Sequence, residues 1–304
     1  MLPLSRPATA RGDDMRRIDE IGTTKAGRLV RRTPRRSTGL IAGGLLTTTL
    51  VAVALISLVW TPLPPGKMQI THKLQPPLSY GLLGTDQYGR DVLSMLMAGA
   101  WNSLSIAAAA VAIGASAGTL IGMFAAARRG LAEAFVMRTA DVIFAVPPIL
   151  SAMMLGAFLG TGRGTAVIAI AVFMVPVFAR VAAGAARQVW SRNYVLAARG
   201  AGKGDLRITI EHVLPNIANQ IIVQATIQLG LAILTEAGLS FLGLGMPPPG
   251  PTWGRMLADA QTYLETAPWL ALLPGLAIAT AVLGFNMLGD GLRDLFDPRT
   301  EGGS

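Results

Sequence analysis

The feature that most constrains the fold is a series of six apolar runs, each 20 residues or longer. They cover residues 39–60, 104–127, 134–159, 165–186, 217–239 and 269–288. A helix rises about 1.5 Å per residue, so each run can cross the roughly 30 Å apolar layer of a bilayer. Because 52% of the residues are hydrophobic and only 14% are charged, the sequence predicts an all-α membrane protein with six transmembrane helices.

The basic residues predict the orientation of these helices. Six crossings would place 21 of the 26 Lys and Arg residues on the side that carries both termini, and five on the other side. Basic residues in loops favour the cytoplasmic face. We therefore expect both termini in the cytoplasm, and we interpret the net charge of +9 as a topology signal rather than a sign of nucleic-acid binding.

The same pattern divides the chain into four parts. Residues 1–37 hold ten of the basic residues and are predicted to be a disordered cytoplasmic tail that contacts anionic membrane lipid. Residues 38–103 would form the first transmembrane helix and an external loop with a short surface helix from Asp91 to Ala100. Residues 104–299 would form a five-helix core with a cytoplasmic loop at 189–215, and residues 300–304 a second tail.

Small residues and prolines indicate what two of the helices do. Gly114, Gly118 and Gly122 recur every four residues, which favours close packing against another helix. Pro147 and Pro148 remove backbone hydrogen bonds and should kink or break the third span. A helix of that kind suits the wall of a translocation path.

Polar residues on the fifth span also require an explanation. Gln220, Gln224 and Gln228 recur every four residues on one helical face, which is unfavourable in lipid and predicts contact with a cavity or another subunit. Hydrogen bonding between helices without any solute contact is the alternative. Glu236 could serve a proton relay, but a lone carboxylate near a helix end more often holds local structure.

A basic, glycine-rich stretch, which we call the hinge segment (residues 189–215), separates the fourth and fifth spans. Gly202 should end a first short helix with a positive φ, and a second short helix should run from Asp205 to Pro215. Residues 200–204 read Gly-Ala-Gly-Lys-Gly. A phosphate-binding loop needs Gly-x4-Gly-Lys-Ser/Thr, so this stretch is not predicted to bind nucleotide.

Several classes of function are disfavoured. The chain has no cysteine, and its two histidines, His72 and His212, are far apart, so no metal site is predicted. An intramembrane enzyme would need paired catalytic groups within the spans. An ion-coupled secondary transporter stays open as an alternative, although Asp141 and Glu236 are the only candidates for its ionisable groups.

The hinge segment resembles the coupling loop of the permease subunits of ATP-binding-cassette importers, in the dipeptide/oligopeptide branch. The matching positions are Tyr194, Ala197, Ala198, Gly202, His212, Leu214 and Pro215, and Leu196 stands where a glutamate is usual. Residues 83–92, 239–254 and 286–294 are similar to the same branch. The resemblance implies an importer-type permease bundle in which Ala198 packs against an ATPase.

The resemblance also implies partners and a location. It implies a second homologous permease subunit, two ATP-binding subunits that hold ATP and magnesium, and an extracytoplasmic substrate-binding protein, in the cytoplasmic (inner) membrane of a prokaryote. No cofactor is expected in this chain. The translocation path is assigned to Gln220, Gln224, Gln228, Pro147 and Pro148, and external docking to Asp86, Arg90, Asp91 and Trp253. Peptides or similar small solutes are the expected cargo.

Overall fold

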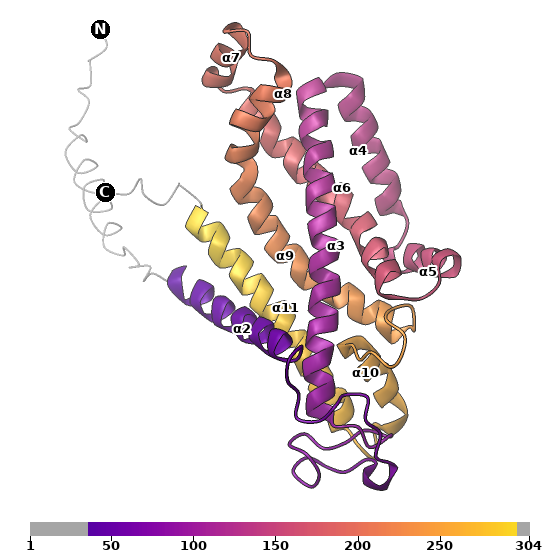
Figure 1. The fold of residues 1–304 in the computed structure, drawn as a ribbon. Helices are drawn as coiled ribbons and strands as arrows, with labels where there is room; N and C mark the ends of the chain where they lie inside the picture. The colour runs from indigo at the N-terminus through magenta and orange to yellow at the C-terminus, as the bar shows by residue number, and fades with distance from the viewer. Residues whose placement is uncertain (1–35, 297–304) are drawn as a thin grey trace, which may run out of the picture. The chain divides into compact units, whose positions relative to one another are not determined.

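The computed structural model describes residues 36–296, so the tails predicted at 1–37 and 300–304 fall almost entirely outside the described residues. The main helices are α2 (Arg36–Ile56), α3 (Val92–Arg128), α4 (Gly130–Ala145), α5 (Pro148–Leu159), α6 (Arg163–Trp190), α7 (Asn193–Gly200), α8 (Asp205–Ile208), α9 (Leu214–Phe241), α10 (Trp253–Ala260) and α11 (Trp269–Phe296). In Figure 1, α7 and α8 lie at one end of the bundle, which we call the hinge end, and α10 lies at the other, the α10 end.

The predicted spans correspond to five long apolar helices and one broken pair. The five are α2, α3, α6, α9 with the turns that precede it, and α11, and the pair α4 and α5 makes a sixth span if it is counted as one. The pair bends by 88°. Val146 and Pro147 are both extended there, because the residue before a proline disfavours the helical conformation. The break predicted at Pro147 and Pro148 is confirmed.

The glycine stripe of α3 packs directly against α6. A Cβ atom at Gly118 would lie 2.7 Å from the Cβ of Phe178, and one at Gly122 would lie 2.9 Å from the Cβ of Ala182. Gly114 is equally crowded by Met174. Real Cβ atoms do not approach so closely, so the two backbones touch in a way that only glycine permits. The predicted packing role of this stripe is confirmed.

The start of α3 is confirmed, but its predicted length is wrong. Asp91 caps the helix, because its carboxylate accepts a hydrogen bond from the Ser94 backbone N–H at 2.8 Å. The helix then continues through Ala100 to Arg128 as one element of 37 residues. Its first turns do not form a separate surface helix. They are buried, and Gly99 packs against the Trp253 ring of α10.

The second short helix of the hinge segment does not end at Pro215. Gly204 precedes α8, and a π-helical turn, Thr209–Val213, joins α8 to α9 without a break. The Leu214 backbone N–H donates to the Thr209 carbonyl, five residues back. The wider turn falls just before Pro215, which has no N–H to donate, and π turns of this kind accommodate such interruptions. The apolar span is therefore continuous with the hinge segment.

Candidate functional site

A small apolar cluster holds the hinge segment against the ends of the long helices. Val195 of α7 is fully buried with Trp190, Ile208 and Val213. The opposite face of α7 is open, with Tyr194 and Leu196 46% and 54% exposed. The segment therefore has one face fixed to the bundle and one apolar face that is free to contact another protein.

The end of α7 is a Schellman motif centred on Gly202. The Lys203 N–H donates to the Ala198 carbonyl at 3.1 Å, and the Gly202 N–H donates to the Arg199 carbonyl at 3.0 Å. Gly202 has a φ of +83°, which strains any residue with a Cβ. The positive φ predicted at Gly202 is confirmed.

Ion pairs connect the residues that follow α7, between Gly202 and the π turn. Glu211 accepts hydrogen bonds from Lys203 Nζ at 2.6 Å and from Arg207 Nε at 2.5 Å. Arg199 pairs with Asp205 at 2.7 Å. These contacts connect α7, α8 and the π turn that leads into α9. Each pair is solvent-exposed and contributes little stability alone, but together they restrict the geometry of the segment.

The residues predicted for coupling are brought together only in part. Tyr194 lies edge-on to His212, with 6.1 Å between ring centroids. Ala197 is exposed, whereas Ala198 is half-buried and packs against the apolar cluster of the chain itself. Successive side chains on a helix point about 100° apart, so Ala197 and Ala198 face different directions. An outward-facing contact is therefore available to Ala197, whereas the contact between Ala198 and an ATPase stays a prediction.

A polar groove runs along α9 from the hinge segment. Its larger cavity, of about 660 Å³, is lined by Val181, Arg192, Asn216, Asn219, Gln220, Val223, Gln224, Ile227, Arg293 and Phe296. A neighbouring cavity of about 360 Å³ includes Tyr194 and Gln220. Asn216 and Asn219 were not predicted, although Asn216 lies four residues before Gln220 and continues the same spacing.

The remaining residues assigned to the path are placed differently. Gln228 is only 5% exposed and does not line these cavities, so its amide lies within the bundle. Pro147 is exposed at the break between α4 and α5. The side chain of Pro148 lies outside what the structure describes.

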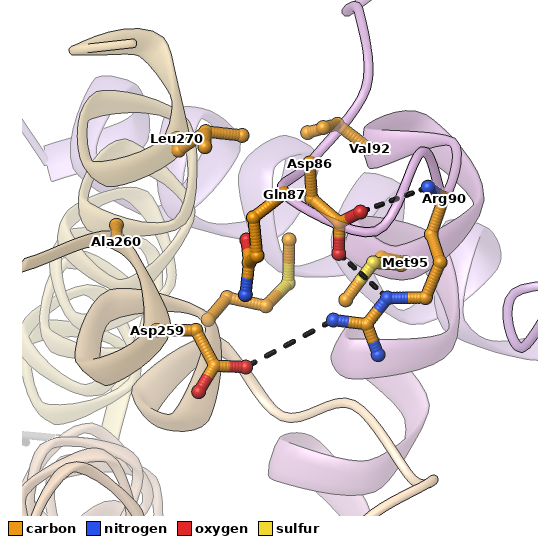
Figure 2. A pocket seen from close by; sticks show the side chains of 9 residues that line it. Asp86, Gln87, Arg90, Val92, Met95, Asp259, Ala260 and Leu270 are labelled. Atoms are coloured by element: carbon orange, nitrogen blue, oxygen red, sulfur yellow. Dashed lines mark hydrogen bonds and ion pairs between the residues drawn. The ribbon is translucent and has the colours of Figure 1, made fainter. Parts of the chain in front are cut away.

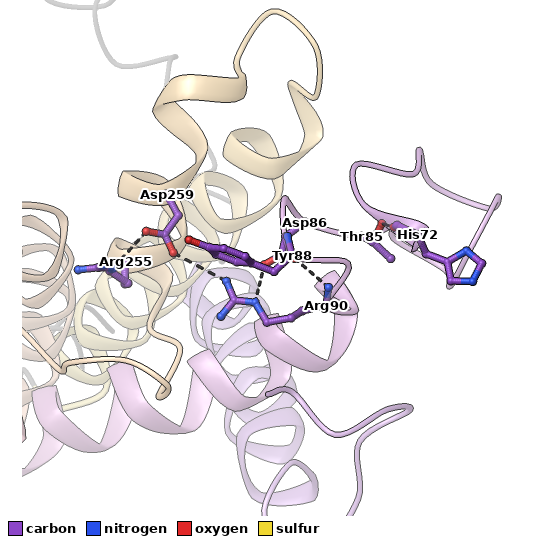
Figure 3. Close-up of polar contacts among 7 residues, drawn as sticks. All are labelled: His72, Thr85, Asp86, Tyr88, Arg90, Arg255 and Asp259. Atoms are coloured by element: carbon purple, nitrogen blue, oxygen red, sulfur yellow. Dashed lines mark hydrogen bonds and ion pairs between the residues drawn. The ribbon is translucent and has the colours of Figure 1, made fainter. Parts of the chain in front are cut away.

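The α10 end is built from the residues predicted for external docking. Asp86 and Arg90 form an ion pair at 2.6 Å, and Asp259 of α10 lies 3.9 Å from Arg90 (Figure 2). The cavity beside them holds only about 20 Å³, which is room for a single water molecule. Arg255 pairs with Asp259 at 3.1 Å, so a chain of charges joins α10 to the loop before α3 (Figure 3).

Burial corrects the docking prediction. Asp86, Arg90, Asp91 and Trp253 are all buried. Trp253 donates its indole N–H to the Leu96 carbonyl at 3.1 Å, a contact across 157 positions of sequence. These four side chains hold the α10 end together instead of presenting themselves to a partner.

The chain is similar to known transport proteins. The binding-protein-dependent transport system inner membrane component family matches residues 118–302. This range contains the hinge segment, α6, α9 and α11. The chain belongs to this family. It is a permease subunit of a transport system.

Individual relatives cover most of the permease. This permease is 43% identical to the di/tripeptide transport system permease protein DppC of Pseudomonas aeruginosa, and the match covers 84% of this chain and 87% of the relative. It is 38% identical to the glutathione transport system permease protein GsiD of Pectobacterium atrosepticum, over 85% and 86%.

A solved structure supports the fold. The inward-facing MetNI methionine ABC transporter matches with a TM-score of 0.56 and 18% identity, over 67% of this permease and 97% of that chain. None of the matches described here is an ion-coupled transporter, so the findings support the importer fold and not that alternative.

Proposed function

We propose that this permease is one of two membrane subunits of an ATP-driven importer for peptides or similar small solutes. The names of its relatives, which refer to di/tripeptide and glutathione transport, support this choice of cargo. Separate subunits would bind ATP and magnesium, and a substrate-binding protein would deliver the solute. The location would be the inner membrane of a prokaryote, with the hinge end in the cytoplasm, as the distribution of Lys and Arg indicates.

One observation supports a mechanism in which an ATPase moves the wall of the groove. The hinge segment continues into α9 without a break, and α9 carries the groove residues Gln220 and Gln224. A displacement of α7 by an ATPase would therefore move the groove wall itself. The exposed face of Tyr194, Leu196 and Ala197 is the surface we assign to the ATPase.

The test is a charge placed on that face. Ala197→Asp should insert normally but abolish ATP-dependent uptake, because docking would bury an unpaired carboxylate. Leu82→Asp is the control and should leave uptake unchanged, since Leu82 is an exposed apolar residue in the loop before α3 and outside the hinge segment. Full uptake by Ala197→Asp with the ATPase subunits still attached would contradict the proposal.

A further inference from the structure

Two arginines line the polar groove without a carboxylate partner. Arg192 lies in the link between α6 and α7 and lines both cavities, and Arg293, in the last turn of α11, lines the larger one. Among the residues that the structure describes, neither guanidinium forms an ion pair. Arg187, Arg199 and Arg207, by contrast, each pair with a carboxylate. The groove therefore carries two positive charges that the described fold does not neutralise.

The wall of the groove holds no compensating negative charge. Within residues 36–296, no Asp or Glu is among the residues that line the two cavities. Asp290 and Asp294 are on the same helix as Arg293 and are exposed, but neither lines the larger cavity or pairs with Arg293. An anion that enters the groove thus meets two cations and no carboxylate in its wall.

Side-chain amides form the rest of the polar wall. Asn219, Gln220 and Gln224 line the larger cavity, and their side chains make no hydrogen bond within the described residues. Asn216 donates one N–H to the His212 carbonyl at 2.7 Å. An amide offers both donors and an acceptor, which is what a peptide group requires. From Asn216 to Gln224 the amides extend about 12 Å along α9.

The position of the two arginines suits a hydrated site. The distribution of Lys and Arg assigns both residues to the cytoplasmic side, and both side chains are exposed. Binding of an anion here needs no burial, because a guanidinium makes short, charge-assisted and often bidentate hydrogen bonds to a carboxylate. The cavity of about 660 Å³ is also within the size range of small-molecule sites.

We propose that Arg192 and Arg293 bind the carboxylate of the transported solute at the cytoplasmic mouth of the groove, while the amides of α9 contact its peptide groups. This inference rests on the proposed function and narrows its cargo to solutes that carry a carboxylate. The same two charges disfavour cations. The phosphate of an anionic lipid offers similar chemistry, so the experiment separates the two sources.

The first measurement reads the charge of the groove. The chain has no native cysteine, and Val223 lines the larger cavity. In the assembled transporter without ATP, Val223→Cys should react about tenfold faster with an anionic methanethiosulfonate than with a cationic one, after each rate is divided by that of a free thiol. The preference should disappear when Arg192→Gln and Arg293→Gln are added and persist with Arg138→Gln. Arg138 is the matched control, since it is exposed and lines neither cavity.

The second measurement identifies the anion, with a neutral methanethiosulfonate as the reagent. N-acetyl-alanyl-alanine should slow labelling about tenfold at about ten times its dissociation constant, whereas alanyl-alanine amide, which has no carboxylate, should not. Arg192→Gln should raise that dissociation constant about tenfold, because a charge-assisted hydrogen bond is lost. Without peptide, labelling should be equally fast in lipid discs of phosphatidylcholine and of phosphatidylglycerol.

Each outcome decides one point. An unreactive cysteine, a charge preference that survives the loss of both arginines, or equal protection by the acid and the amide would overturn the inference. Slower labelling in phosphatidylglycerol alone would assign the two arginines to lipid and reject the solute site. ATP-dependent uptake of alanyl-alanine is measured on the unaltered transporter. Uptake without protection rejects this site alone, whereas failure of uptake to depend on ATP rejects the proposed function.

Discussion

The Schellman motif at the end of α7 allows one prediction to be worked out in detail. Gly200 and Gly202 both have open space where a Cβ would point, so a change to alanine at either position adds no steric contact. The two differ only in backbone conformation. Gly200 is helical, whereas Gly202 has a φ of +83°.

The same substitution should therefore have opposite effects two residues apart. Gly202→Ala should destabilise the motif by about 1 kcal/mol, since L-residues are strained in the left-handed region. Gly200→Ala should stabilise α7 by about 0.5 to 1 kcal/mol. Gly202→Val places a branched side chain at the same φ, costs about 2 kcal/mol, and should abolish ATP-dependent uptake while membrane insertion stays normal.

Hydrogen exchange at the Lys203 amide measures the effect directly, because that N–H donates to the Ala198 carbonyl. Exchange should accelerate about fivefold in Gly202→Ala and slow by about two- to fivefold in Gly200→Ala. Equal rates in the two variants would show that the φ of Gly202 does not hold the motif, and the argument for a rigid hinge segment would be refuted.

Three further predictions concern the groove, the orientation and the packing. Gln224→Leu should lower uptake while complex yield and basal ATPase activity are unchanged, and normal uptake with poor yield would instead show a purely structural glutamine. Leu82 and Leu206 are both exposed. A cysteine at Leu82 should be labelled by an impermeant reagent from outside the cell, and a cysteine at Leu206 should not. The reverse pattern would contradict the predicted orientation. Gly118→Ala should cost about 1–3 kcal/mol through overpacking against α6 and reduce folded yield, whereas Gly184→Ala, which faces open space, should not.

Local chemistry made much of the fold predictable. The apolar runs indicated the spans, the proline pair indicated the break after α4, and Asp91 indicated the start of α3. The positive φ of Gly202 followed from its place after a short helix. Each of these depends on residues within one or two turns of one another, which is the range over which sequence patterns carry information.

The burial of residues at the α10 end could not be predicted, because it depends on contacts between residues that are far apart in the sequence. The α10 helix buries the first turns of α3 through Trp253, and no local pattern reveals that partner. The contact of Arg90 with Asp259 likewise joins residues that are far apart in the chain. At Pro215 the error was different, because a π turn lets the helix continue where a proline normally ends one.

The contact between α3 and α6 has a consequence for how this permease can move. With two backbones touching at three successive glycines, neither helix can slide or roll past the other without atomic overlap. We expect α3 and α6 to move together as one rigid unit during transport, so shape change is left to the break at Val146 and Pro147 and to the movement of α9 with the hinge segment. Spin labels on α3 and α6 should keep a constant separation with and without ATP, while the separation between labels on α4 and α9 changes.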